Sequence, residues 1–565
     1  MSTFSSSVSL PQVPDDLTLE QFILSDNDTR HPGRPVRPES AAWLSSNATG
    51  RNMYLREIRE RTSGLAAGLH SRFGIRETDV VLIISSNHID YPICIWAVHR
   101  LGAIVSPCNP SSTVPELVYQ LSQTLPALII AHATVLDVAF ASAAEVGIPA
   151  DRIVVLADEG ESPQGPMTVD QLALHCAGGA FLGRKLLPGE GRTKIAFFCA
   201  SSGTTGKPKI VAISHFAVLA NVLQIAKHNK VNEGDIKTQR YRPGDLCLAV
   251  LPFYHIYGLD FVLHFVLFSG MTVVVVPKFN FKQMLDSIVT HKINQLILAP
   301  PQVALLCKDP IVKSYDLSTV RAVLCAGAPL SAELNQQLID LLPNAQTGQA
   351  YGQTESTGVV SMWSTRTKHG SNGGELVPGV LARIVKSDDT FAKFNEPGEL
   401  LVKTPAAASG YFNNEEATKE TFVEGWLRTG DQVMINEQNE IIYIDRLKEI
   451  MKVRGFQVAP AEIEGCMLGS ELVADVCVVG IPDDFSGEVP LAFIVPTTAA
   501  MKMIQKDPEA VKRSIMEYVA KLKSHYKHVR RVEFVEEIPK NPSGKLLRRI
   551  LRERAKRLMI PASKL

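Results

Sequence analysis

The sequence lacks several features that would restrict it to a specialised class of protein. It has no net charge, with 58 Lys and Arg against 58 Asp and Glu, which argues against a general binder of nucleic acid or anionic membranes, because such proteins carry a basic excess. Its nine cysteines form no CxxC pair, and several lie in apolar runs such as YPICIWAV, as expected of buried, reduced thiols. It shows neither a secretory signal nor an uninterrupted apolar run that would span a membrane. The composition of its 565 residues, 45% hydrophobic and 21% charged, is that of a globular protein.

Strand-like and helix-like segments alternate over most of the chain. The runs DVVLIISS, PALIIAH and NQLILAP indicate buried strands, and DYPICIWAVHRLG indicates a helix that Gly102 ends. Continuous β-branched runs between helices predict sheets that are covered on both faces. The sequence therefore predicts an α/β fold with more than one sheet.

The pattern changes near residue 430. The segment DQVMINEQNEIIYID predicts a hairpin, and the basic segment RLKEIMKVRG follows it. A helix opened by Pro460, two strands and a long helix come next. We place a boundary at Arg446, with a large multi-sheet α/β domain over 1–445 and a small α+β domain over 446–565, each a usual domain size or larger.

The segment SSGTTGKPK at 201–209 is unusually polar for a link between two apolar runs. Gly203 and Gly206 permit backbone angles that turn successive N–H groups toward one centre, where a polyphosphate would bind. The segment is not a Walker loop, because only two residues separate its glycines and Pro208 follows Lys207. A solvated Ser/Gly turn remains an alternative on composition alone. The hydroxyl and ammonium donors are Ser201, Ser202, Thr204, Thr205, Lys207 and Lys209.

Five further motifs follow this segment. They are LPFYHIYG at 251–258, GQAYGQTES at 348–356, GWLRTGD at 425–431, DRLKEIMKVRGFQVAPAEIE at 445–464 and PKNPSGK at 539–545. In this order and spacing the motifs resemble the adenylate-forming superfamily, and most of all its 4-coumarate–CoA ligase branch. The resemblance implies an ATP-dependent acid–thiol ligase, which activates a carboxylate as an acyl-adenylate, releases pyrophosphate and transfers the acyl group to CoA. ATP, Mg²⁺ and CoA are the implied cofactors and co-substrates.

The resemblance assigns the nucleotide and metal contacts. The 201–209 loop would cradle the β- and γ-phosphates, although the family usually has Gly where this chain has Ile210. Glu355 and Thr204 would hold Mg²⁺, which offsets pyrophosphate charge. Without the resemblance, Glu355 would be interpreted as a helix-start carboxylate and Asp431 as a turn residue. The adenine, α-phosphate and ribose contacts would come from Gln349, Ala350, Tyr351, Thr354, Asp431 and Arg446.

The resemblance also implies a mobile small domain with two working orientations. Lys545 would draw the carboxylate toward the α-phosphate in a site closed to water, although by itself it would be interpreted as a solvated lysine of a basic tail. Rotation about Lys448 would then replace Lys545 by the segment MKVRGFQ. Gly455 would leave room for the pantetheine arm of CoA. The remaining CoA contacts would come from Lys278, Lys452 and Arg454.

The LPFYHIYG motif would form part of the acyl pocket. His255 occupies a gating position in the family, although a histidine in an apolar stretch is more often a core side chain. Ile256 disfavours amino-acid substrates, because an apolar side chain would leave their ammonium group buried and unpaired. We expect an apolar acid of some bulk: an aryl-propenoate, a medium-chain fatty acid or a polyketide-like acid. The expected pocket residues are Tyr257, Phe261, Gly327, Ala350, Gly358 and Val359.

Three other functions remain open: a luciferase-like oxygenase, a stand-alone adenylation enzyme that loads a carrier protein, and a catalytically inactive binding protein. The presence of Lys545, Glu355 and Asp431 argues against the last. The final residues, Ser563, Lys564 and Leu565, match the tripeptide that the peroxisomal import receptor recognises. We therefore expect a peroxisomal location, with that receptor as a partner, and neither nucleic-acid binding nor a membrane span.

Overall fold

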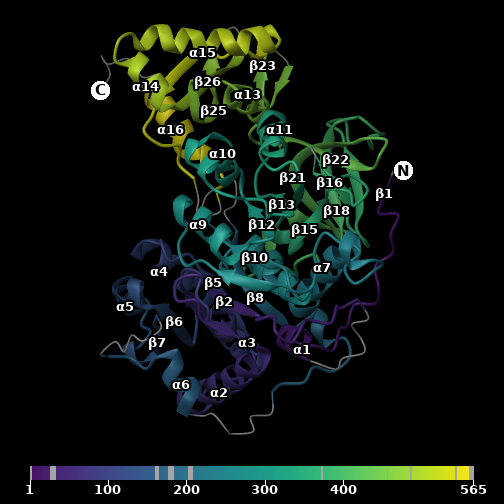
Figure 1. The fold of residues 1–565 in the computed structure, drawn as a ribbon, viewed down its shortest axis with the longest axis vertical. Coiled ribbons are helices and arrows are strands. Elements are labelled where there is room, and N and C mark those ends of the chain that lie inside the picture. The colour runs from purple at the N-terminus through teal and green to yellow at the C-terminus, as the bar shows by residue number, and fades with distance from the viewer. Residues whose placement is uncertain are drawn as a thin grey trace.

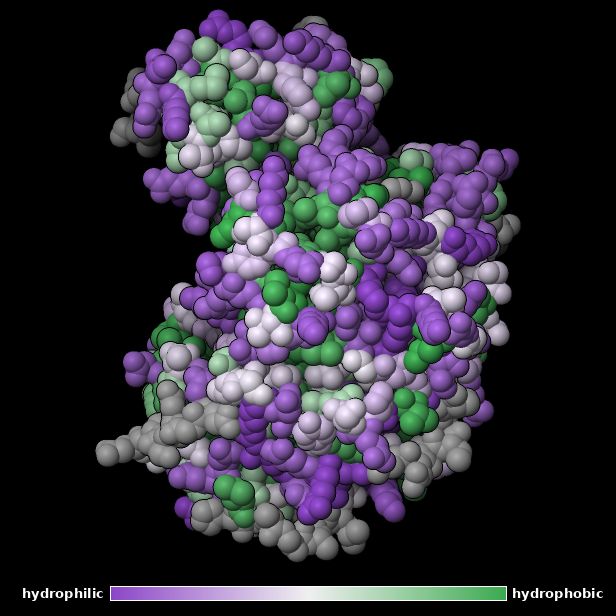
Figure 2. Space-filling model, in the orientation of Figure 1, coloured by the Kyte–Doolittle hydropathy of each residue, from purple (hydrophilic) through white to green (hydrophobic). Residues whose placement is uncertain are grey.

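The computed structural model describes residues 3–25, 33–158, 165–175, 183–201, 208–370, 373–454, 456–483, 486–540 and 544–558. A large lobe and a small C-terminal lobe follow one another along the long axis (Figure 1), and they meet at a narrower waist (Figure 2). The large lobe is α/β and the small lobe is α+β, which confirms the predicted fold class. Several predicted site residues lie outside the described residues: Ser202, Gly203, Thr204, Thr205, Gly206, Lys207, Gly455, Ser563, Lys564 and Leu565.

A sheet with the strand order β19-β9-β8-β5-β4-β6-β7 forms the lower part of the large lobe. Its strands β4 to β8 are parallel where they pair, and β9 runs antiparallel to β8. The bounds are β4 Val80–Ile84, β5 Ile104–Cys108, β6 Leu128–His132, β7 Ile153–Leu156, β8 Ile195–Ser201, β9 Lys209–Ser214 and β19 Gly410–Tyr411. The predicted buried strands in this part of the chain are thus confirmed.

The polar 201–209 segment links β8 to β9. Ser201 pairs with Lys209 and Ala200 pairs with Ile210, so the two strands enter and leave the loop side by side. Ile210 is buried with Phe198 and Ala212. The departure from the family pattern at Ile210 therefore falls on a packed strand residue, where a side chain contributes to the core and a glycine would not.

A longer mixed sheet extends from the large lobe toward the waist. Within the described residues its order is β1-β17-β18-β21-β22-β16-β15-β14-β13-β12-β10-β11-β2-β3, with β20 beside β21. The parallel half contains β2 Leu44–Ser46, β10 Leu246–Ala249, β11 Thr272–Val275, β12 Gln295–Leu298, β13 Ala322–Cys325 and the start of β14 Gln346–Gln353. The rest is β1 Phe4–Ser5, β3 Asn52–Met53, β15 Gly358–Met362, β16 Gly374–Leu376, β17 Leu381–Val385, β18 Gly398–Lys403, β20 Phe422–Val423, β21 Trp426–Ile435 and β22 Glu440–Arg446.

Strand β14 joins the two halves of this sheet. Its first residues pair in parallel with β13, and Ala350 to Gln353 pair antiparallel with β15. The GQAYGQTES motif therefore lies where the pairing changes direction. The carboxyl ends of β10, β12 and β13 meet at the same edge, which is where α/β sheets bind ligands.

Helices cover these sheets, and α1, α2 and α3 lie at the end away from the small lobe (Figure 1). Gly102, with φ +75°, follows α3 as predicted. No helix among the described residues is long and apolar enough to cross a bilayer. The large-lobe helices are α1 Leu19–Leu24, α2 Leu55–Phe73, α3 Tyr91–Arg100, α4 Val114–Thr124, α5 Leu136–Glu145, α6 Val169–His175, α7 His215–His228, a π-helix Tyr257–Phe265, α8 Val266–Phe268, α9 Phe281–His291, α10 Pro300–Lys308, α11 Ala332–Leu341 and α12 Glu415–Thr421.

The small lobe has its own sheet and its own hydrophobic clusters. Pro460 is the first residue of α13, as predicted. The large-lobe strand β22 ends at Arg446 and the small-lobe strand β23 begins at Met451, so residues 447–450 join the lobes. The helices and strands of the small lobe are β23 Met451–Val453, β24 Phe456–Val458, α13 Pro460–Leu468, β25 Val473–Asp483, β26 Gly487–Pro496, α14 Thr498–Ile504, α15 Pro508–Leu522, β27 Arg531–Phe534 and α16 Arg548–Leu558.

Candidate active site

The base of the polar loop contacts a buried carboxylate. Ser201, the last residue of β8, donates a hydrogen bond of 2.8 Å to Glu355 Oε1, and Tyr411 donates one of 2.9 Å to the same oxygen. The Lys209 ammonium lies 4.7 Å from the centre of the Tyr411 ring. Glu355 is thereby oriented by residues from β8 and β19, so the predicted metal carboxylate lies beside Ser201, the first residue of the predicted phosphate loop.

A second buried carboxylate lies on β21, at Asp431. Tyr351 donates a hydrogen bond of 2.6 Å to Asp431 Oδ2, and Arg446 Nε lies 3.2 Å from Asp431 Oδ1. Asp431 and Arg446 are cross-strand partners in the β21–β22 hairpin. Burial raises the pKa of Asp431, while Arg446, Tyr351 and Lys545 oppose that rise. The site thus supplies a buried acceptor next to a cation, which suits two ribose hydroxyls beside a phosphate.

Lys545 approaches both carboxylates from the small lobe. Close to it in the chain, Lys540 bridges to Leu546 and Leu547 N donates to Pro539 O at 2.9 Å. Burial lowers the pKa of Lys545 to about 8, and Arg446 contributes in the same direction, whereas Asp431 and Glu355 raise it. Lys545 is therefore within electrostatic reach of the nucleotide-site residues on the large lobe.

His255 lies on the same side of the site as Lys545. Burial and the charge of Lys545 lower the pKa of His255 to about 4, so its ring is neutral at physiological pH. Its Nδ1 accepts from Tyr257 N at 3.3 Å. The motif that carries His255 is fixed by Asn87, whose side chain bonds Leu251 O at 2.9 Å and Phe253 N at 2.8 Å. A fixed neutral imidazole between the lobes is compatible with the predicted gating role.

The predicted acyl-pocket residues come from the π-helix and from β14 and β15. The rings of Tyr257 and Phe261 meet edge to face, with centroids 6.1 Å apart. Phe261, Ala350 and Val359 belong to one hydrophobic cluster, and Tyr257 packs against it. Gly327, with φ +90°, is exposed just beyond β13. The structure thus places the aromatic residues of the predicted pocket on the π-helix and Ala350, Gly358 and Val359 on β14 and β15, with Gly327 just beyond β13.

Other predicted residues are not brought to this centre. Lys278 is exposed beyond the end of β11, and Lys448 is exposed in the segment that joins the lobes. Lys452 and Arg454 lie on the exposed β23–β24 hairpin, where their backbones bond Glu488 and Ser486. The described residues that were predicted to bind CoA are therefore not assembled around Asp431 in this lobe orientation. In contrast, Gln349 and Thr354 lie in the GQAYGQTES segment with the site residues Tyr351 and Glu355.

The sequence did not reveal Tyr411 as a site residue. It reaches Glu355 because β19 pairs with β9, which places Tyr411 opposite Val211. About 200 residues separate Tyr411 from the loop in the sequence, so no local pattern could have shown this contact.

Asp260 is a second residue that sequence analysis missed. Both of its carboxylate oxygens are buried and have no hydrogen-bond partner among the described residues, and burial raises its pKa well above 3.8. A Cβ placed on Gly358 would lie 2.9 Å from Asp260 Oδ2 and 2.8 Å from Asn221 Oδ1. Gly358 is therefore required next to a buried, neutral carboxyl group.

We predict that Asp260→Asn stabilises the protein more at high pH than at low pH. The folded state retains a proton on Asp260 that the unfolded chain releases above its ordinary pKa of 3.8, so the wild-type free energy of unfolding falls as pH rises. Asparagine does not titrate, and we expect a gain of about 1–3 kcal/mol at pH 8. Thermal melts of both proteins at pH 5 and pH 8 measure the difference in stability. A gain in stability that does not depend on pH would contradict a protonated Asp260 in the folded state.

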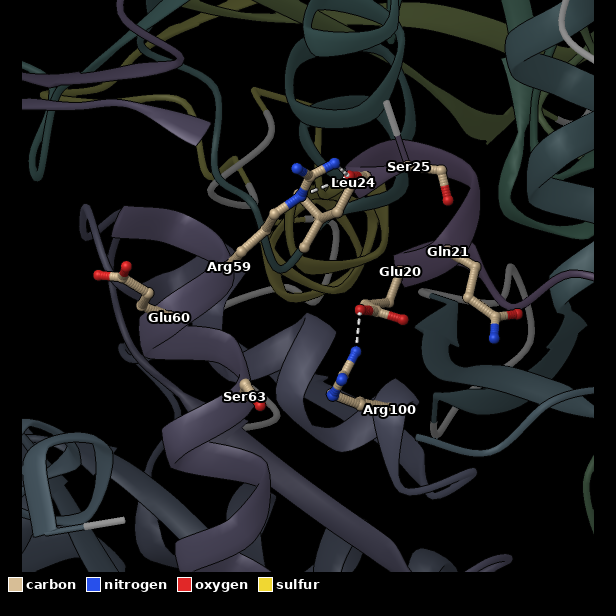
Figure 3. Close-up of a pocket in the computed structure, with 8 residues that line it drawn as sticks. All are labelled: Glu20, Gln21, Leu24, Ser25, Arg59, Glu60, Ser63 and Arg100. Carbon is tan, nitrogen blue, oxygen red and sulfur yellow. Dashed lines mark hydrogen bonds and ion pairs between the residues drawn. The ribbon is translucent and has the colours of Figure 1, made fainter. Parts of the chain in front are cut away.

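The cavity in Figure 3 is separate from these residues. It measures about 440 Å³ and lies between α1, α2 and α3, at the end of the molecule away from the small lobe. Its polar groups bond one another: Arg59 Nε donates to Leu24 O at 2.8 Å, and Arg100 Nη1 donates to Glu20 Oε1 at 2.9 Å. We interpret these contacts as fastening α1 to the helices beside it.

No group of three or more His, Cys, Asp or Glu side chains that could hold a metal by itself occurs in the described part of the chain. Glu355 nevertheless offers a buried carboxylate beside Ser201 at the base of the predicted phosphate loop, with one oxygen oriented by two hydroxyl groups. Mg²⁺ prefers oxygen ligands and commonly binds one or two carboxylates together with substrate phosphates. The chemistry of Glu355 therefore fits that ion.

Comparison with known proteins gives consistent matches. A family model described as AMP-binding enzyme matches residues 28–412, and one described as AMP-binding enzyme C-terminal domain matches residues 462–545. The chain is 33% identical over 567 residues to 4-coumarate–CoA ligase 2 of Oryza sativa subsp. japonica, covering 98% of this chain and 95% of that protein. It is 34% identical over 563 residues to peroxisomal OPC-8:0-CoA ligase 1 of Arabidopsis thaliana, covering 97% and 96%.

Solved structures share the fold. The anthranilate CoA ligase AuaEII in complex with anthranoyl-AMP matches with a TM-score of 0.83 at 23% identity, covering 97% of this chain and 98% of that chain. ATP-bound MatB from Rhodopseudomonas palustris matches with a TM-score of 0.82 at 23% identity, covering 96% and 100%. Both lobes are therefore included in the shared architecture.

Proposed function

Because the chain belongs to the AMP-binding enzyme family, which confirms its resemblance to adenylate-forming enzymes, we propose that it ligates an apolar carboxylic acid to CoA at the expense of ATP. The observation that carries this proposal is the convergence of Lys545 with Asp431 and Glu355, three charged residues from three distant motifs. A catalytically inactive binding protein would have no need of a half-buried lysine on the small lobe whose charge interacts with two carboxylates of the large lobe.

In the first half-reaction a carboxylate oxygen attacks the α-phosphorus of ATP. The α–β phosphoanhydride bond breaks, and pyrophosphate leaves with the bonding electrons. We assign ribose binding to Asp431, with Arg446 beside it, and α-phosphate binding to Thr354. Lys545 stabilises the negative charge shared by the acid and the α-phosphate, and a preorganised cation in a closed site is an effective means of doing so. The loop from Ser201 to Lys209 receives the β- and γ-phosphates.

Glu355 would hold Mg²⁺ together with the ATP phosphates, and Thr204 is the other predicted ligand. When bound, the ion supplies positive charge to the leaving pyrophosphate. Tyr411 and Ser201 orient Glu355 through the oxygen that they share. They are therefore positioning residues of the metal site.

In the second half-reaction the CoA thiolate attacks the acyl carbonyl, and the bond from the carbonyl carbon to the AMP oxygen breaks. In the observed orientation Lys545 occupies the site, while Lys452 and Arg454 lie on an exposed hairpin. We propose that rotation of the small lobe about Lys448 moves Lys545 out of the site and brings the hairpin of Lys452 and Arg454 in. Gly455 would then face the pantetheine arm. Lys278, at the exposed end of β11, would bind the CoA nucleotide.

The predicted pocket residues favour an aryl, medium-chain fatty or polyketide-like acid, because they are apolar and combine the aromatic pair Tyr257 and Phe261 with small side chains. The deciding experiment is pyrophosphate release from ATP over a panel of such acids, with and without CoA. We expect acid-dependent release and, with CoA, an acyl-CoA product. Release without any acyl-CoA would favour the carrier-loading alternative, light emission with luciferin and oxygen would favour the oxygenase, and no release with any acid would refute the proposal.

The pH dependence of adenylation should report Lys545. The pKa of Lys545 is about 8, so the cation required for adenylation is present below that pH and is lost above it. We expect kcat/KM for pyrophosphate release, which reports groups of the free enzyme, to fall as pH rises through about 8. Lys545→Arg should be slower but should lack this fall, because arginine stays charged. If kcat/KM fell with pH in the same way in the wild type and in Lys545→Arg, the fall could not be assigned to Lys545.

A peroxisomal location is proposed from Ser563, Lys564 and Leu565 and accords with the name of one relative. Microscopy of a protein with a fluorescent domain fused at its N-terminus tests it. Deletion of the last three residues should abolish co-localisation with a peroxisomal marker.

A further inference from the structure

Helix α10 contacts the small lobe at both of its ends. It follows β12 and lies at the waist (Figure 1). At its C-terminus, the ammonium of Lys308 donates hydrogen bonds of 2.9 Å to Leu468 O and of 2.9 Å to Val473 O. At its N-terminus, the backbone of Gly544 is packed so closely that a Cβ there would lie 3.3 Å from Ala299 Cβ and from the Pro301 ring.

These two contacts are suited to fixing an orientation. A nine-residue α-helix is about 13 Å long, so its ends contact the small lobe at well-separated points. One contact would leave the lobe free to turn about it, whereas two contacts on a rigid helix restrict the rotation. The contact at Gly544 directly precedes Lys545, so this orientation is the one that places Lys545 in the site.

The carbonyl groups that Lys308 contacts are suited to bind a cation. Leu468 is the last residue of α13 and Val473 is the first of β25. Carbonyl groups in the last turn of a helix lack intrahelical partners and carry the negative end of the helix dipole. The Leu468 side chain also packs against the hydrophobic clusters of both lobes. Lys308 thus bonds the small lobe at a point where the two cores meet.

We propose that Lys308 is a positioning residue that holds the small lobe in the adenylation orientation and so selects between the two half-reactions. The inference rests on the proposed function. Lys308 belongs to the large lobe, and it acts on the reaction through the placement of Lys545. When the small lobe rotates, its two hydrogen bonds must break, and the freed carbonyl and ammonium groups are then solvated by water.

The test separates the two half-reactions. Lys308→Met keeps the length of the side chain and removes its donors, and Lys313→Met, at an exposed lysine of the following turn, is the matched control. With the best acid of the panel, we expect Lys308→Met to slow pyrophosphate release about tenfold, the size expected when hydrogen bonds from a charged group are lost. Thioester formation from the supplied acyl-adenylate should be unchanged or faster. Lys308→Arg should restore most of the adenylation rate. Equal loss in both half-reactions would overturn the proposal.

A double-mutant cycle tests whether Lys308 acts through Lys545. In the Lys545→Ala background, adding Lys308→Met should change the adenylation rate less than twofold, because the residue to be positioned is gone. An undiminished effect in that background would overturn the proposal.

A measurement without turnover separates this inference from the proposed function. In the free protein, Lys308→Met should raise hydrogen exchange of the amides of Ala299 and Gln302 and of residues 468–476, at the two contacts between α10 and the small lobe, while Lys313→Met should not. Unchanged exchange would refute the positioning role even if the enzyme is a ligase. Raised exchange in a protein that releases no pyrophosphate with any acid would instead leave Lys308 as a contact between the lobes and refute the ligase.

Discussion

Replacing Lys545 by alanine is expected to reduce acyl-adenylate formation by about 10²–10³-fold, the loss typical of removing one preorganised charge-stabilising group. Lys545 reaches the site from the small lobe, where its charge is coupled to Arg446, Asp431 and Glu355. Alanine would leave the nucleotide contacts intact but would remove the cation that brings the acid to the α-phosphate. Single-turnover pyrophosphate release measures the effect.

The second half-reaction provides the internal control. Lys545→Ala should convert a supplied acyl-adenylate to the thioester at nearly the wild-type rate, because Lys545 has left the site in the proposed second orientation. Lys556→Ala, at an exposed position of the neighbouring helix α16, should leave both rates unchanged. If Lys545→Ala slowed both half-reactions to the same extent, the two-orientation mechanism would be wrong.

Replacing Asp431 by alanine is expected to lower kcat/KM for ATP by at least about 10²-fold, because two charge-assisted hydrogen bonds, each contributing about 1.5–3 kcal/mol, would be lost. Asp431 is also the partner of two half-buried residues, through the Tyr351 hydroxyl and the Arg446 guanidinium. Arg446 would then be left near the site without its carboxylate. We expect the variant to be less stable as well, because removing one member of a buried ion pair is costly.

Two comparisons separate nucleotide binding from stability in this prediction. Asp431→Asn retains the shape and the hydrogen-bond acceptor and should lose less stability than alanine, while still weakening ATP binding. Glu437→Gln, at the exposed turn of the same hairpin, should change neither. Equilibrium binding of ATP and thermal melting, measured on the same samples, distinguish the two effects. An unchanged affinity for ATP in Asp431→Ala would refute the ribose assignment.

The relative sizes of these effects follow from where each residue acts. Lys545 and Asp431 contact substrate atoms in the proposed mechanism, so their loss falls directly on binding or on the transition state. Lys308 changes only the balance between two lobe orientations, and Asp260 changes only the stability of the folded protein. We therefore expect the adenylation rate to fall most when Lys545 or Asp431 is replaced, less when Lys308 is replaced and least when Asp260 is replaced.

Much of the fold could be predicted because its strands are continuous apolar runs. The run at β4 and the helix α3 that Gly102 ends were recognisable from local sequence. The start of α13 at Pro460 was also recognisable from local sequence, because proline is well accommodated in the first turn of a helix. These signals involve residues close together in the chain, and the structure confirms them.

Parts of the site could not be predicted because they depend on contacts between distant segments. Tyr411 reaches Glu355 through the pairing of β19 with β9, and Lys308 bonds carbonyl groups 160 and 165 residues away. Asp260 lies in an apolar stretch whose pattern indicates only burial. Residues of α7 and β15 pack beside its carboxyl group, which has no hydrogen-bond partner in the part of the chain that the structure describes.

By itself, the sequence determined the α/β class and the order of the motifs, and it predicted which charged residues would serve a nucleotide-dependent ligase. The tertiary structure alone decided that Lys545 lies with Asp431 and Glu355, that Tyr411 orients a carboxylate and that Lys308 bonds the small lobe. The physical reason is that secondary structure follows from neighbours along the chain. A site of paired buried charges instead requires partners brought together by packing, without which those charges would stay in water.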